Sequence, residues 1–548
     1  MSSLDPVTSL LGKRKAKHLL RRATYNYTKE KIELFAGYNI TQAMADLSEP
    51  SVPILTEPHD PQESTADAQN WTSSAELPNS FSGQGRKRSA VTAQWWYNAY
   101  NQVTLEHKLT FFLHTCFTTS KDAGTGSATY FYDHLRLLGQ YSMGNIKELA
   151  KKITLDHAML FYLDNNANNA NNPNENYARE FLELFTILKG PQKGEGDYTN
   201  YTEGDIQTAA RVFSGYRNQN DRSIIDFDTN LPSGYADPNK HDSSDKTFSA
   251  AFGGAVIMGK DTASGMLDEL SDFVDMIFDQ DATGISYVRK LYKYFVKSEW
   301  NSDVEANVIA PLAMELKAGG YEVLPIVQKL LSSQHFFDED DADNTDNIIG
   351  SIIKSPLQLF TEICSFFQVP MVDATESANL KEYYQLFFKN FVHNSCFAAS
   401  GLNFFSPDTV AGYAASYQEP DFDRHWFTST SIISRYKMVQ SLLLGKNLIA
   451  GWGKFTAALN SVSFIEANVS DPYDADKVIG EMAGLMYPED IDQDRKNYFL
   501  TVLLGDFDKV YWTGAWGTYK SDGDDISVRI RLDELVTAMV NAAEFQLM

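Results

Sequence analysis

The chain has 548 residues, a hydrophobic content of 43% and a formal net charge of −25 at pH 7. This acidic balance excludes nucleic acid and an anionic membrane as main partners, because both require clustered lysine and arginine side chains. Three cysteines without metal-ligand or redox spacing imply no disulfide framework, and no apolar run is long enough to span a bilayer. The first residues lack a secretory signal, so the sequence alone predicts a cytoplasmic protein. The length leaves open whether residues 1–548 form one helical unit or two packed subdomains.

The first 120 residues are predicted to be helical apart from one polar excursion. Apolar residues recur at helical spacing from Lys15 to Leu47, and Thr28 is typical of a helix start. Residues 49–88 are rich in Ser, Pro, Asp, Gln and Gly and end in a basic triplet, which predicts an exposed loop. Residues 95–120 are apolar on most faces, which predicts one long helix buried in the core.

The rest of the chain is also predicted to be mostly helical. Asn174 after Pro173 is a candidate N-cap, and the segment from Thr202 to Asp205 resembles a capping box, so a helix should follow each. Residues 224–259 change to short β-prone pieces and turns, which predict a small β excursion. Residues 401–426 are dense in Pro, Gly and aromatic residues, as in an ordered loop. The predicted fold class is therefore mainly α.

Glu106, His114 and Cys116 form the first group of candidate functional residues. Glu106 and His114 are eight positions apart in the predicted long helix, so both side chains can border one cavity. A carboxylate and an imidazole in one cavity bind a metal or transfer a proton. The alternative is a core histidine that one hydrogen bond satisfies.

The second group lies on the predicted helix that begins at Glu175. Arg179 is four positions from both Glu175 and Glu183, and Glu180 precedes Glu183 by three. This spacing is typical of an ion-pair ladder, but the neighbouring residues are so apolar that part of the charged face should be buried. Arg211, in the next predicted helix, is expected to pair with Glu180 or Glu183. A structural network and a working site both remain open.

The third group is the dipeptide His241-Asp242, followed by Lys246 in a turn-rich segment. A loop held on a rigid scaffold often carries functional residues, so this pair can approach a site formed by helices. A solvated surface turn is the alternative. The chain contains no Gly-rich phosphate loop, nucleophile elbow, HExxH zinc helix or dinucleotide fingerprint.

Seven segments, taken together and in order, resemble one protein family. They are LLRRATYNYT (19–28), EHKLTFFLHTCFTTS (106–120), YLDNN (162–166), NPNENYAREFLELFT (172–186), YTEGDIQTAARVFSGY (201–216), HDSSDKTF (241–248) and EFQLM (544–548). On these segments the chain resembles the domain of unknown function 1800 family of large bacterial proteins over nearly its whole length.

The resemblance implies a mostly helical fold but assigns no reaction. It further implies export to the cell envelope and a partner protein of a sulfatase-like family. The chain departs from the family by showing no export signal, and at Cys116 and Tyr216, where the family commonly has His and Trp. If the family's two histidines bind a metal, Cys116 has to replace one of them as a thiolate.

Two hypotheses follow for function. In the first, the chain is an enzyme acting by hydrolysis or redox chemistry on an envelope or carbohydrate substrate. His114, Glu175 and Glu183 then hold a divalent metal, and Glu180, His241 and Asp242 carry out acid–base catalysis. In the second, the chain is a non-catalytic scaffold or a partner-binding or glycan-binding protein. The same polar residues then form a buried structural network, and the aromatic loop from Phe404 to Trp426 is the binding surface.

Overall fold

The computed structural model describes residues 3–73, 83–195, 197–341, 347–451 and 453–548, and its fold is mainly α, as predicted. The α-helices of the first 340 residues are α1 (Gly12–Ala23), α2 (Lys29–Ala36), α3 (Ile40–Leu47), α4 (Ala66–Gln69), α5 (Gln84–Asn101), α6 (Glu106–Cys116), α7 (Ala128–Tyr141), α8 (Ile146–Ile153), α9 (His157–Tyr162), α10 (Glu175–Glu180), α11 (Glu203–Val212), α12 (Ala263–Phe278), α13 (Asp281–Phe295), α14 (Ser302–Val304), α15 (Ala310–Ala318) and α16 (Val323–Ser332). Those that follow are α17 (Pro356–Phe366), α18 (Ala414–Tyr417), α19 (Ser431–Leu443), α20 (Ser461–Asn468), α21 (Ala475–Met486), α22 (Gln493–Leu504), α23 (Lys509–Asp522), α24 (Ile526–Asn541) and α25 (Ala543–Gln546).

Other helix types and short hairpins complete the fold. The π-helical segments are η3 (Phe181–Phe185), η6 (Glu305–Ile309) and η9 (Glu382–Phe397). The 3-10 turns are η2 (Asn165–Ala167), η4 (Pro238–Lys240), η5 (Ala250–Phe252), η7 (His335–Phe337), η8 (Ser377–Asn379), η10 (Ala398–Ser400) and η11 (Phe422–Trp426). The antiparallel strand pairs are β1 (Gln192–Gly194) with β2 (Asp197–Tyr198), β3 (Tyr216–Arg217) with β4 (Tyr235–Ala236), β5 (Lys246–Thr247) with β6 (Val256–Ile257), and β7 (Lys446–Ala450) with β8 (Gly453–Ala457). The predicted β excursion at 224–259 is therefore confirmed by β4, β5 and β6.

The predicted helix starts are confirmed at atomic level. The Thr28 side chain accepts from the backbone N–H of Lys31, and that of Asn174 accepts from Asn176. Thr202 and Asp205 form the capping box, each side chain accepting from the backbone N–H of the other. These caps satisfy N–H groups that have no partner within the helix.

The prediction of one long helix over 95–120 is wrong. The chain forms two helices there, because α5 ends at Asn101 and α6 begins at Glu106. Between them Thr104 accepts from the backbone N–H of Glu106 and donates to the carbonyl of Glu49, which starts a new helix at an angle to the old one. In addition, α5 begins at Gln84, within the segment predicted as an exposed loop, and Lys87 is buried against Asp60 and Glu63. Residues 74–82 of that segment lie outside the described residues.

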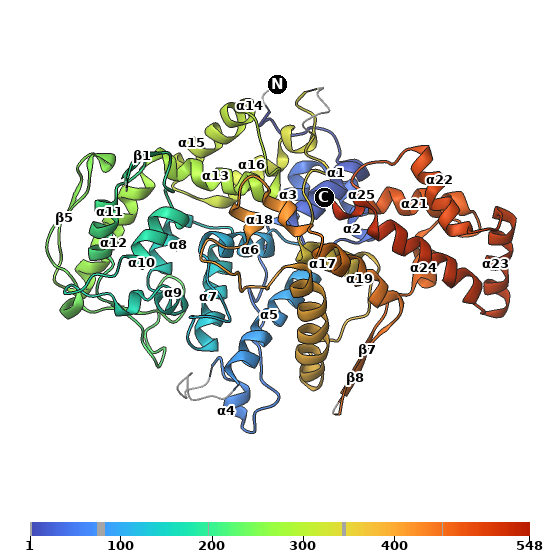
Figure 1. The fold of residues 1–548 in the computed structure, drawn as a ribbon, viewed down its shortest axis with the longest axis horizontal. Helices are drawn as coiled ribbons and strands as arrows, with labels where there is room; N and C mark the ends of the chain where they lie inside the picture. The colour runs from blue at the N-terminus through green and yellow to red at the C-terminus, as the bar shows by residue number, and fades with distance from the viewer. Residues whose placement is uncertain (1–2, 74–82, 196, 342–346, 452) are drawn as a thin grey trace.

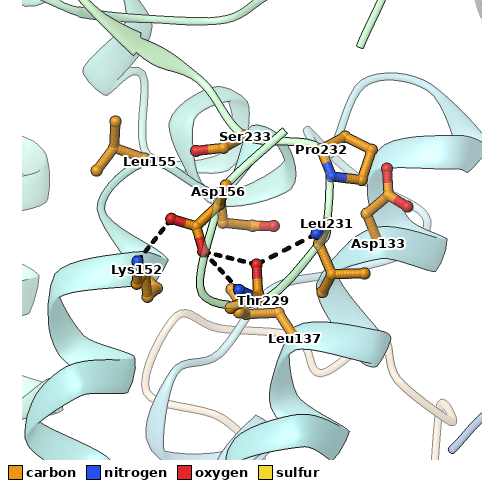
Figure 2. A pocket seen from close by; sticks show the side chains of 10 residues that line it. Asp133, Leu137, Lys152, Leu155, Asp156, Thr229, Leu231, Pro232 and Ser233 are labelled. Atoms are coloured by element: carbon orange, nitrogen blue, oxygen red, sulfur yellow. Dashed lines mark hydrogen bonds and ion pairs between the residues drawn. The ribbon is translucent and has the colours of Figure 1, made fainter. Parts of the chain in front are cut away.

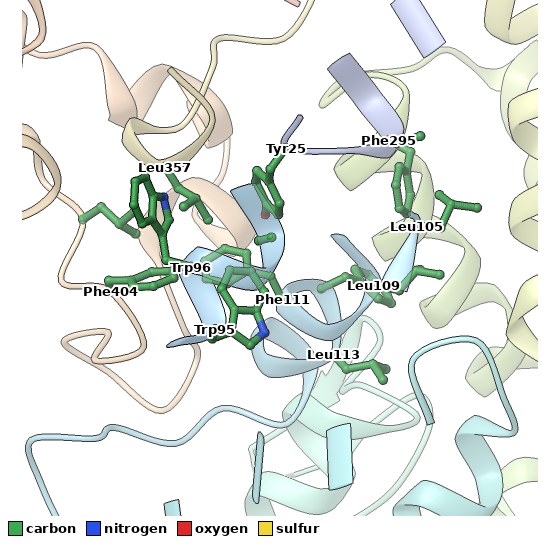
Figure 3. Close-up of a cluster of buried hydrophobic side chains, with 14 of the residues drawn as sticks. Tyr25, Trp95, Trp96, Leu105, Leu109, Phe111, Leu113, Phe295, Leu357 and Phe404 are labelled. Carbon is green, nitrogen blue, oxygen red and sulfur yellow. The ribbon is translucent and has the colours of Figure 1, made fainter. Parts of the chain in front are cut away.

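The two halves of the chain meet along α5 and α6, near the centre of the molecule (Figure 1). Trp95 of α5 packs against Phe111 of α6 and Phe404 of the 401–426 segment, with ring centroids 6.2 Å and 5.6 Å away. Tyr25 and Leu357 lie beside the same cluster (Figure 3). These side chains come from α5, α6 and α17 and from the segments around Tyr25 and Phe404. One apolar core therefore joins the two halves of the chain.

Basic side chains of α1 hold the last residues of the described chain. Arg22 donates to the carbonyl of Met548 at 2.6 Å, and Arg21 is paired with Glu362 of α17 at 2.9 Å, with both side chains fully buried. Figure 1 accordingly places the C-terminus beside α1.

No helix among the described residues combines the length and apolar character needed to cross a bilayer.

Candidate functional site

A cavity of about 410 Å³ lies where α6, α13 and α17 meet the 401–426 segment. Its walls combine cationic side chains with aromatic rings, and the protein around it is strongly acidic. The charged residues of the wall are Lys108, Arg289, Lys290, Lys293, Glu419 and Asp423. Its aromatic residues are Tyr25, Phe111, Phe112, Tyr294, Trp300, Tyr417, Phe422 and Trp426. Tyr25 and Phe111 are labelled in Figure 3, where they edge the central core.

Lys108 and Gln358 form the most buried polar pair of this wall. The Lys108 ammonium donates to Gln358 Oε1 at 2.6 Å and lies 4.3 Å from the centroid of the Tyr25 ring. Since the ammonium only donates, it fixes the Gln358 amide with its oxygen toward Lys108. Gln358 Nε2 is then buried without an acceptor in the described part of the chain. Such an orphaned donor costs about 1–3 kcal/mol, and both residues of this pair line the cavity.

Burial makes Lys108 an unusual lysine. Removal from water, and secondarily the positive charge of Arg22, lowers the pKa of Lys108 from 10.5 to about 7, although Glu362 acts in the opposite direction. No carboxylate of the described residues lies within 4.0 Å of its ammonium. At neutral pH the side chain is therefore divided between its charged and neutral forms.

Two further lysines on α13 face the cavity without a carboxylate partner. The Lys290 ammonium donates to the carbonyl of Leu184 at 2.6 Å, and that of Lys293 lies 4.1 Å from the centroid of the Phe422 ring. Burial lowers the pKa of both side chains. Arg289 differs, since it is paired with Glu305 at 2.7 Å. The cavity wall therefore carries lysine charges that no carboxylate of the described residues pairs within 4.0 Å.

The two carboxylates of the wall offset part of this charge. Asp423 is fully engaged, accepting from the Ser298 hydroxyl and from the backbone N–H of Ile353, each at 2.7 Å. Glu419 only raises the pKa of Lys293 by its charge. Three aromatic residues of the segment predicted to form a binding surface, Tyr417, Phe422 and Trp426, thus line one side of this cavity.

The first predicted group does not form a shared cavity. His114 is buried on α6, and its Nε2 donates to the carbonyl of Thr119 at 3.1 Å, while its Nδ1 has no partner among the described residues. Glu106 instead accepts from the backbone N–H of Ser51, and burial raises its pKa to about 7. Cys116 lines the cationic cavity, where burial raises its pKa to about 11, so its thiol stays protonated at neutral pH.

The second predicted group is divided by a change of helix type. Glu175 pairs with Arg179 at 3.1 Å, as the spacing predicted, and Arg179 also pairs with Glu203 of α11. Glu183 does not continue this ladder, because the chain turns π-helical at Phe181 and one more residue enters each turn. Glu183 pairs with Lys189 instead. The predicted pairing of Arg211 with Glu180 or Glu183 is wrong, since Arg211 binds Asp242 at 2.7 Å.

Glu180 has no ion pair or hydrogen bond among the described residues. Burial, and secondarily the charge of Glu183, raises its pKa from 4.5 to about 7. Its ionised form is therefore disfavoured in the fold, and stability is lost as the pH rises from below 4.5 to above 7. The role of Glu180 in catalysis stays a prediction.

Glu180→Gln should accordingly raise the melting temperature at pH 8 and have little effect at pH 4. The reason is that glutamine keeps the shape of the protonated acid and carries no charge. Thermal unfolding at the two pH values measures this. A large loss of stability at pH 8 would show that the ionised carboxylate has a buried partner after all.

The third predicted group belongs to a buried ion-pair network. His241 Nδ1 donates to the carbonyl of Ser214 at 2.8 Å, and its Nε2 lies 3.1 Å from Glu269. Glu269 also binds Lys246 at 2.6 Å, and both side chains are fully buried. Burial would raise the pKa of Asp242, but hydrogen bonds from Arg211 and Ser244 lower it below its ordinary value. Both nitrogens of His241 are occupied, so the geometry points to helix packing, and the catalytic roles of His241 and Asp242 stay predictions.

Glu269→Gln should lower the free energy of unfolding by about 3–5 kcal/mol, because it leaves the Lys246 ammonium buried without a carboxylate. Denaturant unfolding measures the loss, with Asp268→Asn on the exposed face of α12 as the matched control. Adding Lys246→Met to Glu269→Gln should recover part of it. Equal stability of Glu269→Gln and the control would rule out a structural role for this network.

The predicted metal ligands do not converge. His114, Glu175 and Glu183 belong to separate surroundings, and within the described ranges no three His, Cys, Asp or Glu side chains are grouped so that they could hold a metal ion. The donor set of the metalloenzyme hypothesis therefore does not fit a divalent cation in this fold.

A smaller cavity beside α8 is structural. It measures roughly 20 Å³, which is room for about one water molecule. Lys152 donates to Asp226 at 2.6 Å, and the Thr229 hydroxyl donates to the same carboxylate at 2.7 Å. Figure 2 labels Lys152 and Thr229 beside this cavity. Nearby Asp133 is paired with Arg222 at 2.8 Å. These ion pairs hold the loop of residues 226–233 in place. The cavity beside it is too small for a ligand larger than water.

Comparison with protein families gives a match over nearly the whole chain. Residues 18–547 match the family described as protein of unknown function (DUF1800). The chain belongs to the DUF1800 family. The resemblance inferred from seven sequence segments is thereby confirmed for this DUF1800 chain, and the family description names no reaction. Searches of curated proteins and of solved structures found no match.

Sequence reasoning missed the lysines and the glutamine of the cavity, although part of the signal was present. Lys108 is a charged residue in the apolar stretch EHKLTFFLH, as are Glu106 and His114, which were singled out. Gln358 interrupts the apolar stretch PLQLF in the same way. Their convergence was not predictable, because α6 and α17 are about half the chain apart.

Proposed function

We propose that this DUF1800 chain binds a small anionic molecule in the cavity between α6, α13, α17 and the 401–426 segment. The observation that carries the proposal is the buried Gln358 amide, whose N–H groups lack an acceptor beside the Lys108 ammonium. A carboxylate, sulfate or phosphate oxygen supplies the acceptor that these donors lack.

The charge of the cavity supports an anion over a neutral ligand. Lys108, Lys290 and Lys293 have no carboxylate within 4.0 Å in the described part of the chain, and their desolvation lowers the pKa of each. Removing one buried and two partly buried ammonium groups from water is costly, and a bound anion offsets that cost. Water alone satisfies the amide but does not neutralise the lysines.

The size and walls of the cavity support a ring-bearing ligand. About 410 Å³ lies within the range of cavities that hold small molecules. Trp300, Tyr417, Phe422 and Trp426 offer ring faces on which a sugar or aromatic ring can stack. An acidic sugar or an aromatic acid fits both the cations and these rings, which agrees with the glycan-binding hypothesis from the sequence.

Binding should be measured by thermal shift with matched ligands. Glucuronate and benzoate should raise the melting temperature, whereas glucose and choline should not, at constant ionic strength. A ligand at 100 times its dissociation constant adds about 2.7 kcal/mol to stability. Because the protein carries a net charge of −25, nonspecific attraction cannot mimic this preference for anions. Equal shifts with glucose and glucuronate would contradict the proposal.

Anion binding should weaken above pH 7. The anion favours the charged form of Lys108, whose pKa in the free protein is about 7. Arg22 and Glu362 face this ammonium too, but arginine stays charged and Glu362, whose pKa is lowered by Arg21 and Lys354 against the effect of burial, stays ionised in this pH range. Affinity should therefore be constant below pH 7 and fall by up to about tenfold per pH unit above it. Calorimetry in buffers of different ionisation enthalpy should show proton uptake near pH 8, and its absence would exclude Lys108 from the site.

The other predictions from the resemblance remain open. A partner protein of a sulfatase-like family and an envelope location are compatible with a ligand-binding role. The assignment of Glu180, His241 and Asp242 to catalysis receives less support from the geometry than the cavity does.

A further inference from the structure

We propose that Lys108 forms an imine with the carbonyl carbon of a 2-oxo acid held in the cavity. This inference rests on the proposed anion-binding function and adds a covalent step to it. The reacting atom is Lys108 Nζ, which lies at the cavity wall with a neutral amide as its hydrogen-bond acceptor.

The surroundings of Lys108 favour the neutral amine that such a reaction requires. No carboxylate of the described residues lies within 4.0 Å of the ammonium, and the Tyr25 ring covers one side of it at 4.3 Å. Burial lowers its pKa to about 7, so a large fraction of the side chain carries a free lone pair at neutral pH. Desolvated lysines of this kind are the ones that form imines with carbonyl compounds.

The position of the Gln358 amide favours a 2-oxo acid over other carbonyl compounds. Lys108 Nζ is 2.6 Å from Gln358 Oε1, and the short bonds of an amide keep Nε2 within about 5 Å of Nζ. Nε2 is tightly packed in the free protein, so the Gln358 amide has to turn toward the cavity; its N–H groups then hold a carboxylate while Nζ faces the next carbon. In a 2-oxo acid the carboxylate and the carbonyl are on adjacent carbons, which matches this spacing.

The step is balanced by groups within the cavity. The lone pair of neutral Lys108 attacks the carbonyl carbon, a C–N bond forms as the C=O π bond breaks, and one nitrogen proton moves to the oxygen to give a carbinolamine. Loss of the hydroxyl group with the remaining nitrogen proton then releases water and leaves the imine. The Tyr25 and Tyr294 hydroxyls, 3.4 Å apart in the cavity wall, can relay a proton from nitrogen to oxygen, because burial raises the pKa of both and keeps them protonated.

Reductive trapping tests the inference. The full chain is incubated at pH 7 with pyruvate and cyanoborohydride, which reduces an imine to a stable secondary amine, and the adduct is located by peptide mass mapping. Wild type should carry the adduct on Lys108 at a level at least tenfold above that on an exposed lysine such as Lys437. Lys108→Arg keeps the positive charge but should carry no adduct at this position, and Lys290→Met should still be labelled on Lys108.

The outcomes separate the imine from anion binding. If pyruvate raises the melting temperature of wild type but Lys108 is labelled no more than Lys437, the imine is overturned and anion binding stands. If pyruvate neither raises the melting temperature nor labels Lys108, the imine is overturned, and the thermal shift with glucuronate decides separately whether anion binding stands. Labelling of wild-type Lys108 needs no variant, so the test holds even if a Lys108 variant does not fold.

Discussion

Lys108→Met should stabilise the protein at pH 6 and abolish anion binding. The fold lowers the pKa of Lys108 from 10.5 to about 7, so the unfolded chain binds a proton more tightly than the folded one. The buried ammonium therefore lowers the free energy of unfolding. This destabilisation is fully present below pH 7 and disappears as the pH rises toward 10.5. Each pKa unit corresponds to about 1.4 kcal/mol.

The expected gain in the free energy of unfolding is smaller than the full pKa shift of Lys108 implies, because Gln358 Oε1 loses its hydrogen-bond donor in the variant. The pKa shift corresponds to about 5 kcal/mol and an unsatisfied buried acceptor costs about 1–3 kcal/mol, which leaves a net gain of about 2–4 kcal/mol at pH 6. Thermal unfolding between pH 6 and pH 9 measures the gain, with the exposed Lys437→Met as the control. A melting temperature below that of wild type at pH 6 would show that the ammonium stabilises the fold and has an unrecognised partner.

Gln358→Glu should weaken anion binding by about 100-fold or more. The substitution keeps the shape of the side chain but replaces the orphaned N–H donors with a carboxylate oxygen. The lost hydrogen bond to a charged ligand accounts for about 1.5–3 kcal/mol, and repulsion between the new carboxylate and the anion adds to it. The new carboxylate also pairs with Lys108, so the protein should remain folded.

Calorimetry with glucuronate measures the effect of Gln358→Glu. The matched control is Gln440→Glu, which makes the same charge change at an exposed position of α19. The control should bind as wild type does. Equal affinity of both variants would show that Gln358 does not contact the ligand.

The fold was predictable where local chemistry determines it. The caps at Thr28, Asn174 and Thr202 were recognised because a side-chain oxygen beside free N–H groups is a local signal. The break between α5 and α6 was missed because Thr104 depends on the carbonyl of Glu49, a partner 55 residues away. Apolar pattern alone does not show where such a distant contact starts a new helix.

The candidate site was less predictable than the fold. Glu106, His114 and His241 were singled out as polar residues in apolar surroundings. In the structure some or all of their side-chain polar atoms are hydrogen-bonded to backbone groups or to other side chains. Lys108 carries the same signal, yet its importance depends on the orphaned amide of Gln358, which only tertiary structure reveals. Helical spacing also failed at Glu183, because a π-helical turn changed its neighbours.

The most direct test of the central claim is a crystal structure of the protein soaked with selenate, whose selenium is located by anomalous scattering. The account predicts a selenium peak in the cavity, with selenate oxygens within hydrogen-bond distance of Gln358 Nε2 and close to Lys108. Selenium peaks confined to the molecular surface, with an unperturbed Gln358, would contradict the proposal that this cavity binds anions.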